Sequence, residues 1–363
     1  MIFLYPVFFF LILRFTVTLF NFISNPKLTY SVKQYKKLVS ILIPARNEAE
    51  NILLLLQSIS KQNYEYFEVI VLDDHSDDET FNLCKQFSEA DNRFQVIKGE
   101  ELPVGWLGKN FACYQLAKQA KGKYLMFLDA DETVSNGLIN NTVHRMELQR
   151  LTLLSLFTNQ VMSSIGERLV VPLMHFVLLN LLPLRLVKLS GNPSFAAASG
   201  QFMFFNAADY HKNQWHLQVK NKVVEDIEIM KLVKGFNYQG EALLANGFVY
   251  CRMYKNLGEA LNGFSKNLLA GFNYNVAGLL FYLLLVISGP PIIWYFGGLQ
   301  LFLFAVSLII LSRIMISLSS GQNPWINLLL HPFQMVFLVI LSVLSIQKYL
   351  TKTITWKGRT IRT

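Results

Sequence analysis

Residues 1–23 are apolar apart from one charge, Arg14. At about 1.5 Å of rise per residue, a helix of this length can cross a hydrocarbon core of about 30 Å. A cleaved signal peptide is the alternative, but the segment has neither a basic start nor a small-x-small cleavage site. Four lysines follow it, and by the positive-inside rule they keep the next domain in the cytoplasm. They are Lys27, Lys33, Lys36 and Lys37.

The last third of the chain repeats the membrane signal at 277–296, 299–318 and 327–345. If all three segments crossed, the basic tail 348–363 would end outside, although lysines and arginines belong inside. Because Pro290-Pro291 and His331-Pro332 interrupt two of these segments, we expect one to be re-entrant or interfacial and the tail to be cytoplasmic. The expected organisation is therefore a multi-pass protein of the cytoplasmic membrane with four parts. These are a helix at 1–24, a globular domain at 37–270 with an interfacial segment near 165–188, a transmembrane region at 275–347 and the tail.

Composition supports a membrane enzyme. Of the 363 residues, 52% are hydrophobic and 13% aromatic, which is too apolar for an ordinary soluble enzyme, although the middle of the chain reads as globular. The net charge of +9 is scattered, with no compact stripe of basic and aromatic residues, so anionic lipid head groups are expected partners and nucleic acid is not. The three cysteines lack metal-ligand spacing and are expected to be reduced thiols without a chemical role. They are Cys84, Cys113 and Cys251.

Between the apolar ends, short apolar runs alternate with helical patterns, as in a parallel α/β domain. The expected strands cover 38–44, 67–72, 94–98 and 123–128. The expected helices cover 48–60, 78–89 and 108–120. This alternation predicts an α/β fold with a parallel sheet in the middle of the chain.

Two acidic clusters come directly after strands of this predicted sheet. Asp73-Asp74 ends one strand, and Asp129-Ala130-Asp131 ends another. In an open α/β sheet ligands collect outside the carboxyl ends of the strands, and paired carboxylates can hold a divalent cation there. Each cluster alone could also be a polar turn, and His75 is expected to be a turn residue. Together, the clusters predict a nucleotide and metal site.

Four motifs in order resemble family 2 glycosyltransferases of the GT-A fold. They cover 39–48, 69–80, 128–131 and 224–226. The resemblance implies a Rossmann-like nucleotide-diphospho-sugar transferase domain with transmembrane helices at both ends of the chain. Further patterns resemble the membrane-bound enzymes that glycosylate carotenoid acids, or those associated with hopanoid synthesis. They cover 105–110, 198–202, 252–254, 263–267 and 356–359.

The resemblance assigns a nucleotide-sugar site to several residues. They are Pro44, Ala45, Arg46, Glu48, Asp74, Lys109 and Asp129. The stretch after the first strand would bind base and ribose, and Asp74 would accept a hydrogen bond from the uracil imide, whereas Asp73 could serve the turn. The first stretch is also consistent with a helix start, since Asn47 is a good N-cap and Glu50 lies three residues on. Lys109 could add positive charge near the diphosphate or be an ordinary surface lysine.

The same resemblance assigns Mg²⁺ or Mn²⁺ to Asp131, with Asp129 contacting the metal or the nucleotide. A metal that bridges the two phosphates would stabilise the departing nucleoside diphosphate. Asp226 would be the general base of an inverting transfer. Alternatively, Glu225 and Asp226 simply open a helix over 227–234, whose N-terminus favours acidic residues. For a carboxylic acid acceptor, which is already ionised, Asp226 would position the acceptor rather than take a proton.

The expected function is transfer of a hexose from a nucleotide-diphosphate sugar, UDP-linked, to a lipophilic acceptor such as a carotenoid acid or another polyisoprenoid. A diacylglycerol, sphingoid or polyprenyl phosphate acceptor is the alternative within the enzyme class. Outside it, the alternative is a catalytically silent nucleotide-binding membrane scaffold. Processive members of the superfamily carry Gln-x-x-Arg-Trp, and this motif is absent from the sequence, which disfavours polymer synthesis.

Overall fold

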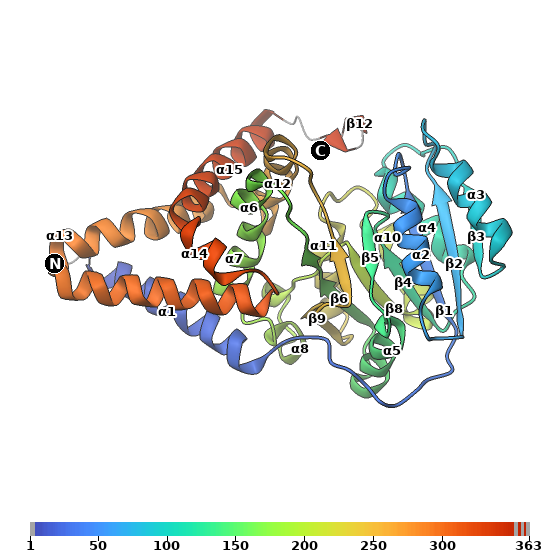
Figure 1. The fold of residues 1–363 in the computed structure, drawn as a ribbon, viewed down its shortest axis with the longest axis horizontal. Coiled ribbons are helices and arrows are strands. Elements are labelled where there is room, and N and C mark those ends of the chain that lie inside the picture. The colour runs from blue at the N-terminus through green and yellow to red at the C-terminus, as the bar shows by residue number, and fades with distance from the viewer. Residues whose placement is uncertain (1–3, 352–354, 357–358, 361–363) are drawn as a thin grey trace. The chain divides into compact units, whose positions relative to one another are not determined.

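The computed structural model describes residues 4–351, 355–356 and 359–360 (Figure 1). The chain forms two units. We call the first the sheet unit; it consists of Pro26–Asn159 and Arg185–Arg252. We call the second the helical unit; it consists of Met1–Asn25, Gln160–Leu184 and Met253–Thr363. The segment expected to be interfacial is thus divided, and most of it belongs with the apolar helices.

The sheet unit is built on a seven-stranded sheet in the order β3-β2-β1-β4-β8-β6-β9. Its strands are β1 (Val39–Ala45), β2 (Phe67–Asp73), β3 (Phe94–Lys98), β4 (Tyr124–Leu128), β6 (Leu153–Phe157), β8 (Phe202–Asn206) and β9 (Gly240–Leu244). Strands β1 to β4 run parallel, whereas β8 is antiparallel to both of its neighbours, β4 and β6. The four strands expected from the sequence are present with ends shifted by no more than one residue. Because β1, β2 and β4 are covered on both faces, they are almost continuously apolar.

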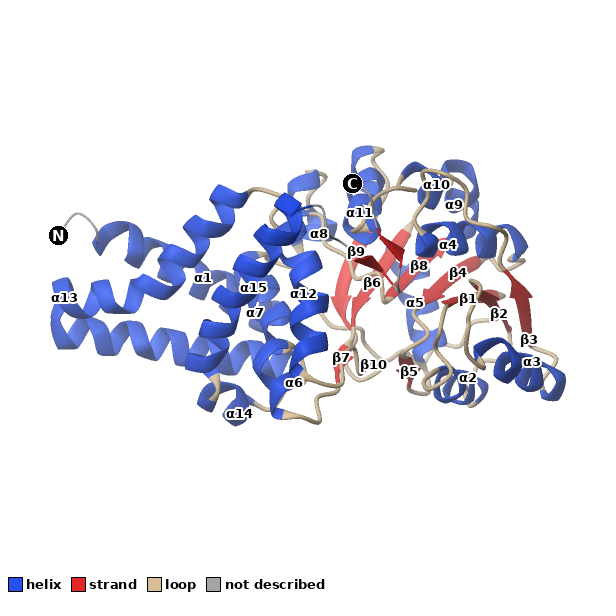
Figure 2. Cartoon of the chain, turned by 90° about the horizontal axis from the view of Figure 1, so that it is seen from above, coloured by secondary structure: helices blue, strands red, loops and turns tan. Residues whose placement is uncertain are grey.

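Helices cover both faces of this sheet. Figure 2 shows α2, α3 and α5 on one face and α4, α9 and α10 on the other. The helices of the unit are α2 (Ile52–Ser60), α3 (Thr80–Ala90), α4 (Gly108–Gln119), α5 (Leu138–Gln149), α8 (Leu186–Leu189), α9 (Ala207–Asn213), α10 (Trp215–Gln218) and α11 (Glu225–Gly235), with a 3-10 turn at Pro193–Phe195. A second sheet has the order β5-β10-β7, formed by β5 (Glu132–Val134), β10 (Val249–Cys251) and β7 (Asn159–Gln160).

One expected boundary is wrong: the helix predicted to start near Glu48 begins at Ile52, with Asn51 as its N-cap residue. Asn47 is not an N-cap, since its backbone is left-handed, with φ of 54°. Its side-chain oxygen instead accepts a hydrogen bond from the amide of Asp77 at 2.9 Å. The residues between β1 and α2 therefore form a loop tied to the loop after β2.

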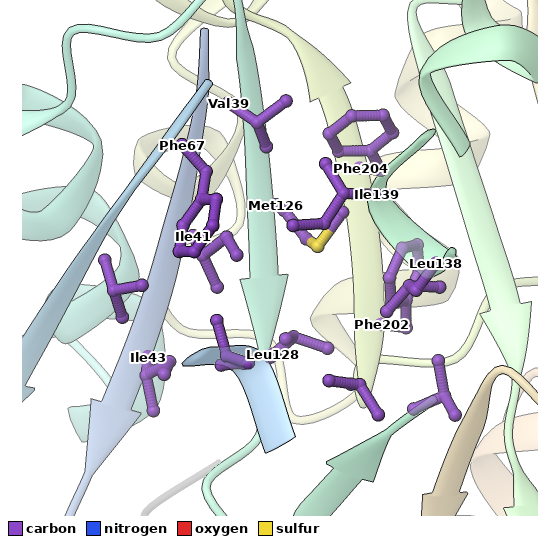
Figure 3. Close-up of a cluster of buried hydrophobic side chains, with 14 of the residues drawn as sticks. Val39, Ile41, Ile43, Phe67, Met126, Leu128, Leu138, Ile139, Phe202 and Phe204 are labelled. Carbon is purple, nitrogen blue, oxygen red and sulfur yellow. The ribbon is translucent and has the colours of Figure 1, made fainter. Parts of the chain in front are cut away.

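The core of the sheet unit lies between the sheet and helices α2, α3 and α5. Ile41, Met126 and Phe204 from three adjacent strands are each fully buried, and Leu138 and Ile139 of α5 pack over them (Figure 3). Full burial of one such side chain stabilises the fold by about 1.5–3 kcal/mol. This packing fixes the strand order and hence the edge at which the strand ends meet.

The helical unit contains the long apolar helices. Its elements are α1 (Leu4–Ser24), α6 (Ile165–Val170), α7 (Pro172–Leu181), α12 (Leu257–Gly271), α13 (Val276–Ser319), α14 (Pro324–Leu329) and α15 (His331–Thr351), with the strands β11 (Thr355–Trp356) and β12 (Arg359–Thr360) pairing near the end. Within the described residues, three helices are long and apolar enough to cross a membrane: α1, α13 and α15. Residues 165–188 contribute none of these, and they form three short helices instead.

Helix α13 consists of two halves that meet at Gly298, where φ is 73° and ψ is 179°. Figure 1 shows the two halves as separate arms that fold back from this point. The halves correspond to the segments expected at 277–296 and 299–318. Pro290-Pro291 lies inside the first half and does not break it. Residues from both halves, Ile293 and Leu308, pack against Val7 of α1.

Candidate active site

The carboxyl ends of β1 and β2 lie side by side, because the register pairs Ala45 with Asp73. The amide of Asp74 donates to the carbonyl of Ala45 at 2.8 Å. Arg46 then reaches across, and its Nη1 donates to the carbonyls of Asp74 at 2.5 Å and His75 at 2.9 Å. The two loops assigned to the nucleotide by the sequence motifs are therefore held together by backbone and side-chain contacts. His75, with φ of 54°, is a turn residue as expected.

The acidic side chains at this edge are buried. Asp73 and Asp74 are each 5% exposed, and Glu48 is 9% exposed. Oδ2 of Asp73 accepts from the amide of Ser76 at 3.3 Å, which is the turn role foreseen for it. The amide of Glu48 donates to Oγ1 of Thr80 at 2.8 Å, so the loop after β1 is fixed on the start of α3.

Asp129 follows β4 and lies beside the start of β8. Its amide donates to the carbonyl of Gln201 at 3.1 Å. Its carboxylate pairs with Nζ of Lys109, from the first turn of α4, with the closest oxygen at 2.8 Å. Lys109 also lies 3.3 Å from Oε1 of Glu225 and donates to the carbonyl of Gly200 at 3.1 Å. Lys109 is thus not an ordinary surface lysine, because it joins α4, β4, α11 and the loop before β8.

The charges around Lys109 set its protonation. Burial lowers the pKa of Lys109, but the carboxylates of Asp129 and Glu225 outweigh burial, so its pKa is raised well above the usual value. The lysine is therefore positively charged at neutral pH. Because Lys109 is one cation between two carboxylates, the three side chains together carry a net negative charge when both carboxylates are ionised.

Asp226 stands on the other side of Gly200, in the first turn of α11. Its Oδ2 accepts from the amide of Gly200 at 2.7 Å, and its Oδ1 accepts from the amide of Ile227 at 2.8 Å. Burial and the neighbouring carboxylate of Glu225 raise the pKa of Asp226 to about 7. A carboxyl group with this pKa can take up or release a proton near neutrality. Glu225 and Asp226 also open helix α11, as the alternative interpretation of this pair predicted.

A glycine, Gly200, lies where these elements meet. A Cβ at position 200 would lie 2.9 Å from Oε1 of Glu225 and 3.2 Å from Nζ of Lys109. Because real Cβ atoms essentially never lie within 3.0 Å of such an atom, a larger residue at this position would displace the carboxylate of Glu225. Gly200 therefore allows the close approach of Lys109, Glu225 and Asp226.

Asp131 lies in a different group, with Glu132 and Cys251. One ligand atom from each residue lies within 4.8 Å of the others. Glu132 and Cys251 are paired across β5 and β10, so their side chains share a face. Glu132 is 1% exposed, and neither carboxylate oxygen has a hydrogen-bond partner among the described residues. Such a pair of orphaned oxygens beside a second carboxylate fits a hard divalent cation.

Protonation distinguishes the ligands in this group. Burial, together with Asp131 and Asp129, raises the pKa of Glu132 well above its usual value. Burial and the same three carboxylates raise the pKa of the Cys251 thiol. A protonated thiol is a poor ligand for Mg²⁺ or Mn²⁺, which prefer oxygen. Asp131 and Glu132 could therefore supply oxygen ligands here, because a bound cation would also favour the ionised form of Glu132.

The structure brings together residues for which the sequence patterns predicted no role in the site. Glu132, Gly200 and Cys251 belong to this set, and Glu225 was expected only as a helix opener. The nearest signal for Glu132 was its position directly after the Asp-Ala-Asp cluster. Cys251 had none, because its partners lie 119 and 120 positions away in the sequence and meet it only through the pairing of β10 with β5.

Replacing Lys109 by methionine is expected to destabilise the sheet unit by about 2 kcal/mol, because two carboxylates then face each other without a cation. Thermal unfolding of the detergent-solubilised protein measures the effect. Lys118→Met, an exposed lysine of the same helix, is the matched control and should be near neutral. Equal melting temperatures for the two variants would show that Lys109 does not hold the carboxylates together.

The fold and site together define a class of protein. A largely parallel sheet with one antiparallel strand, and with acidic clusters at its strand ends, is the arrangement of the GT-A fold. A mannosyltransferase from Pyrobaculum calidifontis, solved in complex with GDP-Man and Mn²⁺, has a similar fold, with a TM-score of 0.57 and 15% identity. The likeness covers 95% of this chain and 97% of that one.

Sequence comparison gives the family. Residues 40–211 match the model of glycosyl transferase family 2, so this part of the chain is a family 2 glycosyltransferase domain. It is 27% identical over 344 residues to the 4,4'-diaponeurosporenoate glycosyltransferase of Staphylococcus haemolyticus (strain JCSC1435), covering 88% of each chain. It is also 33% identical over 115 residues to a UDP-Glc:alpha-D-GlcNAc-diphosphoundecaprenol beta-1,3-glucosyltransferase of Escherichia coli, covering 32% of this chain and 43% of that protein.

Proposed function

We propose that this enzyme transfers a hexose, with inversion, from a UDP-linked sugar to a lipophilic acceptor, a carotenoid acid or another polyisoprenoid. The observation that carries the proposal is the joining of Lys109, Asp129 and Asp226 around Gly200. This cluster lies in a chain that aligns over most of its length with a 4,4'-diaponeurosporenoate glycosyltransferase. The cluster supports sugar transfer, and the alignment supports a lipophilic carboxylic acid as acceptor.

For the donor, we assign the nucleotide to the loops after β1 and β2. Strand β1 continues past Pro44 and ends at Ala45, which pairs with Asp73, and the loop from Arg46 to Glu48 offers amides and polar side chains to base and ribose. Asp74 is proposed to accept the imide hydrogen of uracil. The tie between Arg46 and the carbonyls of Asp74 and His75 supports this assignment, because it keeps the two loops in one fixed arrangement.

The diphosphate is assigned to the ends of β4 and α4. Asp131, with Glu132, is proposed to hold Mg²⁺ or Mn²⁺, and Asp129 to contact the metal or the nucleotide. Such a cation would act as a Lewis acid and stabilise the negative charge on the departing diphosphate in the transition state by several kcal/mol. Lys109 holds Asp129 in place at 2.8 Å and adds a fixed positive charge. The orphaned oxygens of Glu132 support the metal assignment.

Asp226 is proposed to act on the acceptor. Two backbone amides fix its carboxylate, and a pKa of about 7 suits a general base. A hydroxyl acceptor would give its proton to Asp226 as its oxygen attacks the anomeric carbon from the face opposite the diphosphate. A carboxylic acid acceptor is already ionised and gives up no proton. For that acceptor Asp226 would position the reacting oxygen.

We propose that the helical unit anchors the enzyme in the cytoplasmic membrane with the sheet unit and the tail in the cytoplasm. Helix α12 leads directly into α13, whose two halves fold back at Gly298, so both ends of α13 lie on one side. Near its end α15 contacts α12: Ser345 accepts from the amide of Leu269 at 3.0 Å, and Lys348 donates to Ser265 at 2.8 Å. This return supports an interfacial or re-entrant α15 and explains how a basic tail stays inside.

A polyprenyl diphosphate-linked acceptor is the second candidate. The Escherichia coli relative, which is named for a diphosphoundecaprenol acceptor and a UDP-Glc donor, favours it. Its similarity covers 32% of this chain, whereas the carotenoid-acid relative covers 88%. We therefore place the polyprenyl acceptor second. Both candidates keep the acceptor in the lipid phase.

The deciding experiment offers the detergent-solubilised enzyme radiolabelled UDP-glucose, Mg²⁺ and a total lipid extract, followed by organic extraction. We expect label in an organic-soluble product, which mass spectrometry would then identify. Parallel reactions with synthetic polyene carboxylic acid and with undecaprenyl-linked GlcNAc separate the two acceptors. If no UDP or GDP sugar labels any lipid while the protein still binds nucleotide, the catalytic proposal is wrong and the silent scaffold takes its place.

A further inference from the structure

Two arginines of the helical unit stand beside one aromatic ring. The guanidinium carbon of Arg14, from α1, lies 5.3 Å from the centre of the Phe176 ring in α7. The guanidinium carbon of Arg313, from the second half of α13, lies 5.2 Å from the same centre. Arginine stays protonated in proteins, so two fixed positive charges share this ring among apolar helices.

Arg313 is fully buried and only partly satisfied. Its exposed fraction is 0%, and its Nη2 donates to Oε1 of Gln334 in α15. Gln334 is itself fully buried and is fixed by donating to the carbonyl of Arg168 at 2.8 Å. Nε and Nη1 of Arg313 have no hydrogen-bond partner among the described residues. A buried guanidinium with unused donors is costly unless an acceptor reaches it.

Arg14 gives access to this pair. It is the only charged residue within α1, at the middle of the helix, and its side chain is partly exposed. Oδ1 of Asn180 accepts from its Nε at 3.1 Å and so fixes one edge of the guanidinium. The rings of Phe10 and Tyr282 lie 5.7 and 5.8 Å from the guanidinium carbon. These contacts therefore fix the orientation of the Arg14 guanidinium group.

In the described helical unit, no carboxylate forms an ion pair with Arg14 or Arg313. The sequence of this unit contains two acidic residues, Glu167 and Glu259. Glu167 accepts from the amide of Ser164 at 2.7 Å, and Glu259 accepts from the amide of Lys255 at 2.9 Å, so both bind backbone at helix starts. Among the residues that the structure describes, no ion pair includes Arg14 or Arg313. Within the described part of the helical unit, the two arginines therefore have no carboxylate as counter-charge.

We propose that Arg14 and Arg313, stacked on Phe176, bind the oxyanion of a membrane amphiphile, a carboxylate or a phosphate ester. Guanidinium groups match both oxyanions through paired N–H donors. Arginines within apolar helices are expensive and mark functional sites when they face a protein interior. The oxyanion contacts the partly exposed Arg14, and the buried charge of Arg313 strengthens its attraction. This site is independent of sugar transfer and goes beyond the proposed function.

The test measures binding of 14-carbon amphiphiles to the full-length protein in an uncharged detergent, by thermal stability titration. The probes are tetradecanoate, tetradecyl phosphate and tetradecanol, which differ only in head group. We expect the anionic probes to raise the melting temperature saturably and tetradecanol to have no such effect. Arg14→Gln and Arg313→Gln should each raise Kd at least about tenfold, as expected for loss of a charge-assisted contact.

Charge-conserving variants separate binding from folding. Arg14→Lys keeps a cation but loses the paired N–H donors, so its Kd for the anionic probes should lie between those of the native protein and Arg14→Gln. Arg168→Gln, which removes a cation of α6 outside the site, should leave Kd unchanged. If Arg313→Gln fails to fold, the comparison of Arg14→Gln with Arg14→Lys still tests the proposal. Preference for the phosphate would identify a phospholipid head group, and preference for the carboxylate a lipophilic acid. Equal binding of all three probes, or no effect of Arg14→Gln, would overturn the proposal.

Discussion

Replacing Asp131 by asparagine is expected to lower kcat for sugar transfer about 1000-fold at a saturating concentration of Mg²⁺ or Mn²⁺. The substitution removes one of two carboxylates proposed to hold the cation, and the Lewis-acid contribution at stake is about several kcal/mol. Glu132→Gln should act in the same direction, because its two oxygens lack other partners in the described structure. Initial rates with a radiolabelled donor, measured across a range of metal concentrations, give both kcat and the metal requirement.

The control for this pair is Glu65→Gln, which changes an exposed acidic residue on the loop before β2. It should leave both kcat and the metal requirement unchanged. If Asp131→Asn retained activity within tenfold of the native enzyme, Asp131 would not hold a catalytic metal. If Glu132→Gln alone had no effect, the ligand set would be Asp131 and Asp129, as the motif by itself suggested.

With a hydroxyl-bearing acceptor, kcat/KM is expected to fall about tenfold for each pH unit below 7. Burial and Glu225 raise the pKa of Asp226 to about 7, so its basic form is present above that pH and is lost as pH falls through it. Asp226→Asn should remove this pH dependence and lower the rate about 100- to 10,000-fold. The pH profile of initial rates, taken over pH 5 to 9 for both proteins, checks the prediction.

The same profile distinguishes the acceptors. A carboxylic acid acceptor has no proton to give, so the rate should vary little between pH 6 and 8 and Asp226→Asn should cost much less. Thermal unfolding of the asparagine variant controls for loss of the contacts to Gly200 and Ile227. A profile with a hydroxyl acceptor that is flat through pH 7 would remove Asp226 from the role of base.

The sequence by itself determined the fold class and located the two acidic clusters of the candidate site. Strands such as 67–72 and 94–98 are short, apolar and bounded by turn residues, so local pattern alone locates them. The acidic clusters were recognisable because they directly follow such strands. The four ordered motifs predicted the family, which comparison confirmed. The four predicted apolar segments correspond to α1, the two halves of α13 and α15, although α15 covers His331–Thr351 rather than 327–345, because length and composition locate such a segment but not its ends.

Tertiary structure decided which of these residues act together. Lys109, Gly200 and Asp226 are up to 117 positions apart in the sequence, and only the strand order that sets β8 beside β4 makes them neighbours. The partners of Arg14 and Arg313 were likewise invisible, because apolar periodicity does not encode which helices pack together. Local structure depends on neighbouring residues and can be read from them. A site depends on contacts between distant residues, which form only when the sheet and helices pack.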